Sequence, residues 1–209
     1  MGRRSQHSPE TLRRMIIEAA EAIVSEGGLA LLSAREIAKR IEYSPGTLYN
    51  VFDNLDDVIV TVEGRVLDRL TRRLEEVATS QARQSPQDRL LELALAYLAF
   101  THENPRVWNL LFEHRLPDGQ ELPEWYMAKL TGLLSQIEAT LAPFFSPEQA
   151  VARARSARVL WAAVHGITSL STSGKLSIIT SQAAAELTED LVRTYITGLQ
   201  DSRRSRSKA

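Results

Sequence analysis

Apolar residues recur at helical spacing along nearly the whole chain, and this pattern constrains the fold more than any other feature. Spacings of three and four residues place side chains on one face of an α-helix. Several of these segments begin with serine or asparagine followed by proline, as helix N-termini do. No segment shows the alternation of β-branched residues that is typical of a strand. The sequence therefore predicts an all-α fold. A clear example is the stripe within residues 9–26 that consists of Ile16, Ala19, Ala20, Ile23 and Val24.

Serine, proline and glycine positions divide the pattern into a small unit and a larger one. Three short helices are predicted in residues 1–53, beginning near residues 9, 33 and 44. Longer helices are predicted in residues 54–200, which would form a helical bundle. The segment 201–209, "DSRRSRSKA", is basic and has no apolar face, so we expect it to be a disordered tail.

Composition and charge limit the class of protein. The chain has 209 residues, no cysteine and a formal net charge of −1, so nucleic-acid binding would depend on local basic clusters. The absence of cysteine excludes disulfides and thiolate metal sites. We find neither an apolar signal sequence nor a membrane-spanning stretch. These features predict a cytoplasmic protein without a membrane association.

Residues 42–52, "EYSPGTLYNVF", indicate a helix of only about two turns with a small, uncharged leading edge. Leu48 and Phe52 are four residues apart and share the face that packs inward. The outward positions can reach DNA: Thr47 and Asn50 can read base edges, and the hydroxyl of Tyr49 can donate to a phosphate. A short exposed helix that follows another helix after a tight turn is the helix-turn-helix arrangement, whose second helix enters the major groove.

The stretch "SAREIAKRIEYSPGTLYNVFDNLDDV" resembles the DNA-binding motif of tetracycline-repressor-type (TetR-family) regulators. The motif, residues 33–52, matches without gaps at Ser33, Ile37, Ala38, Ser44, Gly46, Thr47, Leu48, Tyr49 and Phe52. The resemblance implies a homodimeric transcriptional regulator with a DNA-binding domain in residues 1–53 and a ligand-binding, dimerising domain in residues 54–200. The residues expected to contact double-stranded DNA are Ser33, Arg35, Ser44, Pro45, Gly46, Thr47, Tyr49 and Asn50.

The motif also departs from the family pattern. Glu42 occupies the position of the turn glycine, Val51 replaces a common histidine, and Leu55 replaces a common lysine. These changes remove backbone contacts and add a negative charge near the DNA. Arginines near the N-terminus can offset this by neutralising phosphates, or they can form a solvated terminus. Both interpretations apply to Arg3, Arg4, Arg13 and Arg14.

Trp161, His165 and Gly166 form a Trp-x-x-x-His-Gly segment that resembles one C-terminal subgroup of the family, named after Trp-His-Gly (WHG). Trp161 and His165 are four residues apart and lie on one helix face. His165 can line a pocket or satisfy a polar group in the interior, and we favour the structural role. Aromatic residues of a helical bundle can be core or can line a ligand cavity. With the resemblance, the candidates for ligand binding are Trp108, Phe112, Trp125, Trp161 and His165.

The last two predicted helices, near residues 147–172 and 181–200, carry apolar stripes that a monomer would partly expose. We expect them to form the homodimer, whose dyad would set two recognition helices at the spacing of a palindromic operator. The stripe residues are Val159, Ala162, Ala163, Ile167, Leu170, Leu187, Leu191, Tyr195 and Leu199.

The sequence thus predicts a repressor whose operator binding is relieved by a small apolar or aromatic ligand, with no cofactor and no metal. One alternative is a helical protein–protein adaptor with weakened DNA binding, which Glu42, Val51 and Leu55 motivate. Another is an enzyme with a site in the bundle core. The pairs His102–Glu103 and Glu113–His114 lack the spacing of a zinc motif, and neither a phosphate loop nor a nucleophile elbow is present.

Overall fold

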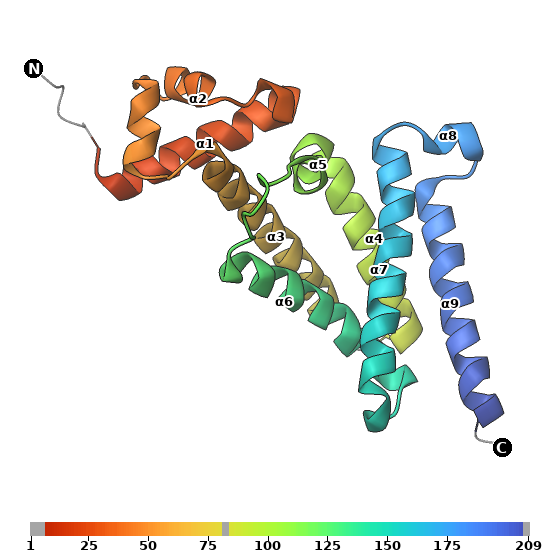
Figure 1. The fold of residues 1–209 in the computed structure, drawn as a ribbon. Coiled ribbons are helices and arrows are strands. Elements are labelled where there is room, and N and C mark those ends of the chain that lie inside the picture. Colours follow the sequence, from red (N-terminus) through yellow and green to blue (C-terminus); the bar gives the residue numbers. More distant parts are fainter. Residues whose placement is uncertain (1–6, 81–83, 207–209) are drawn as a thin grey trace, which may run out of the picture. The chain divides into compact units, whose positions relative to one another are not determined.

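The computed structural model describes residues 7–80 and 84–206, and all regular elements within them are helices (Figure 1). This confirms the predicted all-α class. The α-helices are α1 (Pro9–Gly27), α2 (Ala34–Arg40), α3 (Leu55–Ser80), α4 (Pro86–Glu103), α5 (Pro105–Glu113), α6 (Glu124–Leu141), α7 (Ala150–Thr172), α8 (Leu176–Ile179) and α9 (Ala184–Arg206). The 3-10 helices are η1 (Leu29–Leu31), η2 (Pro45–Asn50), η3 (Ala142–Phe144) and η4 (Pro147–Gln149).

Backbone contacts divide the described residues into two compact units. The N-terminal unit consists of residues 7–68 and 104–127, and the C-terminal unit consists of residues 69–80, 84–103 and 128–206. Helix α5 therefore belongs with the helix-turn-helix, whereas α3 and α6 each supply residues to both units. This division differs from the boundary at residue 53 that the motif alone indicates.

In the N-terminal unit, α1 packs against α2, η2 and α5. The helix begins at its N-cap Ser8, whose hydroxyl accepts a hydrogen bond from the Thr11 amide at 3.2 Å. Its apolar stripe closes the core of the unit because it faces both helices of the motif. The fully buried side chains at this junction include Ile16, Ile23, Ile37 and Leu48.

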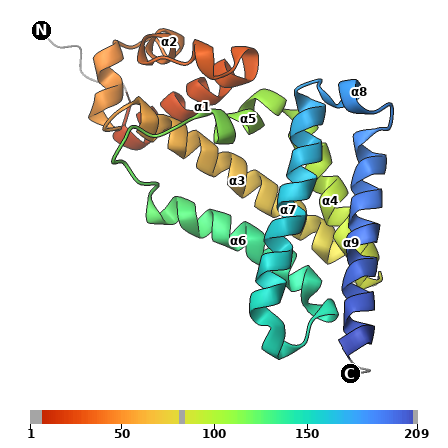
Figure 2. The ribbon, with the colours of Figure 1, turned by 45° about the vertical axis from the view of Figure 1, so that its right-hand side comes forward.

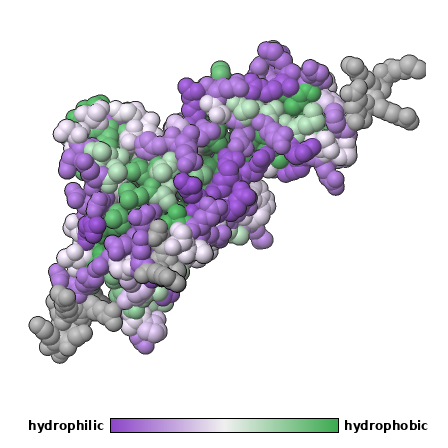
Figure 3. Space-filling view, turned by 180° about the vertical axis from the view of Figure 1, so that it is seen from behind, coloured by the Kyte–Doolittle hydropathy of each residue, from purple (hydrophilic) through white to green (hydrophobic). Residues whose placement is uncertain are grey.

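In the C-terminal unit, α9 runs alongside both α4 and α7 (Figures 1 and 2). The buried side chains of these three helices include Leu90 of α4, Leu160 of α7 and Val192 of α9. Apolar residues also reach the surface of the molecule, as the green areas of Figure 3 show on the face seen from behind. Ile178 and Ile179 of α8 are examples, with 82% and 69% of their surface exposed.

Two details differ from the sequence-based expectations. The recognition segment η2 is a 3-10 helix and not an α-helix. Helix α9 continues to Arg206, so the prediction of a disordered tail is wrong for residues 201–206, and residues 207–209 lie outside the described part. Extending an existing helix requires no new nucleation, so a polar segment can stay helical without an apolar face of its own.

Within the described ranges 7–80 and 84–206, no helix is both long enough and apolar enough to cross a bilayer.

Candidate DNA-binding site and ligand cavity

The two helices of the motif present a polar, solvent-exposed edge. Ser33, the N-cap of α2, accepts a hydrogen bond from the Glu36 amide at 3.1 Å, and Arg35 lies exposed in the first turn. On η2, Leu48 is buried whereas Tyr49 is 55% exposed. Among the remaining residues expected to contact DNA, only Thr47 is half-buried; Ser44, Pro45, Gly46 and Asn50 are exposed.

Two side chains hydrogen-bond to each other at the beginning of η2, and the space in front of this segment is open. Ser44 does not cap the backbone, and its hydroxyl hydrogen-bonds instead to the Thr47 hydroxyl at 3.0 Å. A Cβ atom added to Gly46 would meet no atom within 4 Å. The protein itself therefore does not need the small size of Gly46, whereas a surface lying against this edge would.

Arg13 lies on α1 and fixes the end of η2. Its guanidinium lies 4.1 Å above the ring of Phe52, a cation–π geometry. The same group donates to the Val51 carbonyl at 3.0 Å and to the Thr61 hydroxyl at 3.4 Å. Arg13 thus positions the recognition segment, a role that the sequence analysis missed. Arg14 is exposed, and Arg3 and Arg4 lie outside the described residues.

Glu42 occupies the turn between α2 and η2 with φ at 61°. Residues with a side chain rarely adopt this left-handed conformation, which glycine adopts without strain. The structure therefore confirms that Glu42 takes the conformation for which the family pattern has glycine.

Replacing Glu42 with glycine should raise the free energy of unfolding by roughly 0.5–1 kcal/mol, because relief of left-handed strain exceeds the entropy cost of glycine. It should also strengthen operator binding, because a carboxylate leaves the DNA-facing edge. Urea unfolding and fluorescence anisotropy measure the two effects. Glu42→Gln is the matched control: it should strengthen DNA binding without stabilising the fold, and equal stabilisation by both variants would contradict the strain argument.

His114, just after α5, forms a buried ionic cluster with the beginning of α3. Its Nε2 atom lies 2.9 Å from the Asp56 carboxylate, and its Nδ1 atom lies 3.1 Å from the Glu63 carboxylate. These carboxylates raise the pKa of His114, with the hydrogen bond to Glu63 as the largest cause. Glu63 is only 3% exposed. Burial, with the nearby Glu63 carboxylate, also raises the pKa of the Tyr126 hydroxyl, which donates to Glu63.

The cluster ties α5 and the segment after it to the helix that follows η2. It also forms the polar wall of an open cavity of about 640 Å³ in the N-terminal unit. Charged residues line this cavity beside apolar ones: Glu63, His114, Arg115 and Glu121 with Leu111, Leu116, Leu122 and Met127.

Substituting His114 with glutamine should lower the free energy of unfolding by about 2 kcal/mol at pH 6, since hydrogen bonds to charged groups contribute roughly 1.5–3 kcal/mol. The pKa of His114 is raised on folding, so its contribution is complete below the unfolded value near 6.5 and is lost as pH rises through the folded value. The difference in the free energy of unfolding between wild type and variant should therefore become smaller from pH 6 to alkaline pH. Urea unfolding at several pH values measures it.

His102→Gln provides the control for this pH series. The ring of His102 hydrogen-bonds to the Leu98 carbonyl and the Ser171 hydroxyl, not to carboxylates. This variant removes an imidazole without removing a carboxylate contact. A pH-independent gap for His114→Gln would contradict the ionic role of the cluster.

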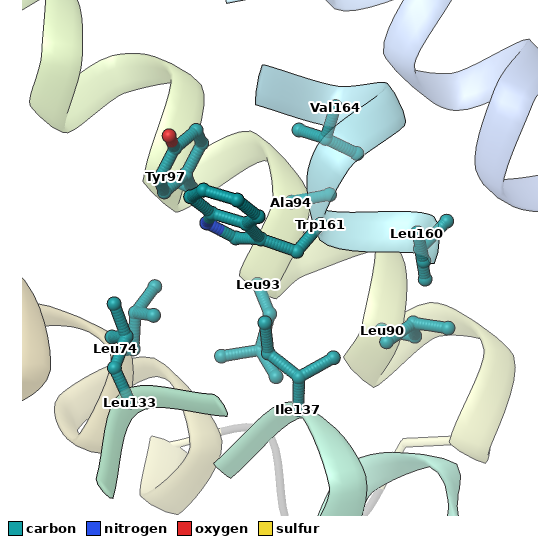
Figure 4. A pocket seen from close by; sticks show the side chains of 10 residues that line it. All are labelled: Leu74, Leu90, Leu93, Ala94, Tyr97, Leu133, Ile137, Leu160, Trp161 and Val164. Carbon is teal, nitrogen blue, oxygen red and sulfur yellow. The ribbon is translucent and has the colours of Figure 1, made fainter. Parts of the chain in front are cut away.

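A second cavity, in the C-terminal unit, is apolar and partly open (Figure 4). Its volume is about 40 Å³, smaller than a drug-sized ligand, so binding requires lining side chains to move. Apart from Tyr97 and Trp161 the lining is aliphatic, from α3, α4, α6 and α7: Leu74, Leu90, Leu93, Ala94, Leu133, Ile137, Leu160 and Val164.

Three aromatic side chains form one group at the edge of this cavity. The Tyr97 hydroxyl and His165 Nδ1 are 2.8 Å apart and share a hydrogen bond. The rings of Trp161 and His165 stack at 5.3 Å with an angle of 7° between their planes. Burial lowers the pKa of His165 and raises that of Tyr97, so both are neutral at pH 7.

The structure brings together only part of the aromatic set expected to bind a ligand. Trp161 lines the apolar cavity, and His165 contacts two of its lining residues without lining it. Trp108 and Phe112 pack against each other on α5, 5.4 Å between ring centroids, and Trp125 is 42% exposed. These three lie in the N-terminal unit, which includes α5 and the first residues of α6. The aliphatic lining residues carried no sequence signal that separates them from ordinary core.

Comparison with known proteins matches two family models to successive parts of the chain. The family model "Bacterial regulatory proteins, tetR family" matches residues 16–61, and "Tetracyclin repressor-like, C-terminal domain" matches residues 90–195. An uncharacterised HTH-type transcriptional regulator of Mycobacterium tuberculosis is 29% identical over 172 residues, 82% of this chain and 75% of that protein. The HTH-type transcriptional repressor KstR of Mycolicibacterium smegmatis is 32% identical over 66 residues, 32% of each chain. A solved structure of a protein of unknown function from Rhodococcus sp. RHA1 shares the fold, with a TM-score of 0.74 and 21% identity over 95% of this chain and all of that one.

A helix-turn-helix unit with an exposed recognition segment, continued by a helical unit with an apolar cavity, defines a DNA-binding transcriptional regulator. The chain belongs to the tetracycline repressor (TetR) family. Members of this family are transcriptional regulators and not enzymes, and they bind operator DNA as dimers. In the described part of the chain, histidine and carboxylate side chains form no group of three or more that could hold a metal ion.

Proposed function

We propose that this regulator is a homodimeric repressor that leaves its operator when a small apolar or aromatic molecule binds in the C-terminal unit. The observation that carries the proposal is the apolar, uncharged cavity lined by Trp161. A ligand that fits only one arrangement of the surrounding helices shifts the population toward that arrangement. The repressor role is supported by the similarity to KstR, which its name describes as a repressor.

The proposed DNA contacts are those of the exposed edge of the motif. Thr47 and Asn50 would read base edges in the major groove, and Tyr49 and Ser33 would donate to phosphates. Gly46 would allow the backbone to approach the DNA closely, since the space in front of it is open. The same DNA-contacting edge would also include Arg35, Ser44 and Pro45.

The proposed dimer interface lies on α7 and α9. None of the nine stripe residues named in the sequence analysis is buried within the protomer: Val159 and Ala162 are exposed, and the other seven are half-buried. Apolar side chains that remain at the surface of a folded protomer are typical of a surface covered by a partner. A two-fold dimer through these helices would present two recognition segments to a palindromic operator.

Ligand binding and DNA binding must be linked reciprocally. If the ligand prefers an arrangement of the two recognition segments that does not match the operator, it weakens DNA binding, and the operator weakens ligand binding by the same factor.

Fluorescence anisotropy tests the proposal. The purified protein is titrated into a duplex from the region upstream of its own gene and into a scrambled duplex, at several salt concentrations. We expect a preference for the native duplex that persists at moderate salt, and loss of this preference when a cavity ligand is added. Equal binding that salt abolishes for both duplexes would show electrostatic contact only and would favour the adaptor alternative.

A further inference from the structure

The indole N–H of Trp161 is buried without a hydrogen-bond partner among the described residues. An indole nitrogen is a donor only, and it usually finds an acceptor when it is buried. Figure 4 shows the indole lying across one side of the apolar cavity, with its nitrogen toward the side of Tyr97. This N–H group therefore lies at the wall of the cavity and lacks an acceptor.

No residue of the cavity lining accepts a hydrogen bond from this donor in the structure. Eight of the ten lining residues are aliphatic and end in carbon. The hydroxyl of Tyr97 is engaged with His165 Nδ1 at 2.8 Å. A water molecule needs two to four polar partners to be held firmly, and the side chains around this space do not offer them. An acceptor on a ligand would face little competition for the N–H.

The residues that line the cavity also disfavour a charged ligand. None of its ten residues is acidic or basic. Tyr97 and the adjacent His165 are neutral at pH 7, for the reasons given above. Transferring a carboxylate or an ammonium from water into such surroundings without a partner is strongly unfavourable.

We propose that the effector is a neutral, mainly apolar molecule that carries one carbonyl-type hydrogen-bond acceptor, and that Trp161 Nε1 donates to this acceptor. The inference rests on the proposed function, in which this cavity is the effector site. It adds the chemical class: ketones, aldehydes and esters belong to it, whereas carboxylates, amines and pure hydrocarbons do not.

The cavity can be enlarged for such a molecule by movement of side chains on α6. Leu133 and Ile137 of this helix lie across the cavity from Trp161 (Figure 4). A displacement of Leu133 and Ile137 would enlarge the cavity and leave the Trp161 donor in place.

Three probes of nearly equal shape test the class. They are 1-(4-butylphenyl)ethanone, the hydrocarbon in which C=CH2 replaces its C=O, and 4-butylbenzoate. Isothermal titration calorimetry measures their binding to the full-length wild-type protein. We expect the ketone to bind about 5- to 10-fold more tightly than the hydrocarbon, as one net hydrogen bond implies, and the benzoate not to bind.

Trp161→Phe removes the N–H and keeps an aromatic ring. In this variant the affinities for ketone and hydrocarbon should become equal. Trp125→Phe makes the same change outside the cavity and should retain the ketone preference. The comparison of ketone with hydrocarbon on the wild-type protein does not depend on whether a variant folds.

Each outcome decides the inference. The inference would be overturned if the wild-type protein binds ketone and hydrocarbon equally, binds the benzoate tightly, or binds none of the three probes. It would also be overturned if the ketone preference survives Trp161→Phe. A ketone preference that requires Trp161 establishes it. If that preference is found but the ketone leaves operator affinity unchanged, the inference stands and ligand-relieved repression fails.

Discussion

Replacing Tyr49 with phenylalanine should weaken operator binding by about 100-fold without lowering stability. The side chain is 55% exposed on η2, beside the exposed Pro45, Gly46 and Asn50, so its hydroxyl is free to meet a phosphate. Hydrogen bonds to charged groups contribute roughly 1.5–3 kcal/mol each. A dimer loses two of them, and about 3 kcal/mol corresponds to a factor of about 100 in affinity.

Fluorescence anisotropy with the operator duplex measures this loss, and thermal unfolding checks the fold. Thr79→Val on α3 is the matched control, because it removes an exposed hydroxyl from the C-terminal unit outside the proposed dimer interface; its operator affinity should stay within a few-fold of wild type. An unchanged affinity for Tyr49→Phe would mean that η2 does not lie against the DNA backbone. The adaptor alternative would then gain support, since its prediction is that Tyr49 is dispensable.

Local signals explain why the helix beginnings could be predicted from the sequence. Ser8 and Asn104 precede a proline and accept hydrogen bonds from the amides three residues later, as expected for N-caps. Ser146 and Gln149 form the predicted capping box, although the first turn is the 3-10 helix η4 and α7 follows it. Such signals act within one turn of chain, so no tertiary information is needed to find them.

The DNA-facing edge was also accessible to prediction, because burial on a short helix follows from spacing. Leu48 and Phe52 are buried as their four-residue spacing predicts. The spacing does not decide between an α-helix and a 3-10 helix over six residues. The strain at Glu42 could be anticipated only through the family resemblance, since a single residue type does not reveal its φ.

The ligand cavity was predicted less well, because it depends on which helices pack together. Trp108 and Phe112 are spaced like cavity residues, but α5 packs against α1 and takes them into the N-terminal unit. The partners of His114 are 51 and 58 residues away along the chain, so no motif could reveal that cluster. Tyr97 was not among the candidates for ligand binding, and its hydrogen bond to His165 became visible in the structure.

Introducing glutamate at Val159 should dissociate the homodimer and, with it, abolish tight operator binding. Val159 is 49% exposed on α7 and lies in the stripe that we propose is covered by the partner subunit. In a two-fold interface each substitution occurs twice, so two carboxylates would be buried close to the dyad without partners. Removing a charge from water without a partner costs several kcal/mol, so the dimer dissociation constant should rise by at least about 100-fold.

Sedimentation velocity over a range of protein concentrations measures the change from dimer to monomer for Val159→Glu. Ser135→Glu, which adds the same charge at an exposed position of α6 in the same unit, should remain dimeric. A monomer presents only one recognition segment, so its operator affinity should fall toward that for a single half-site. If Val159→Glu remains a dimer with wild-type operator affinity, the two subunits do not meet along this stripe, and another surface must set the spacing of the recognition segments.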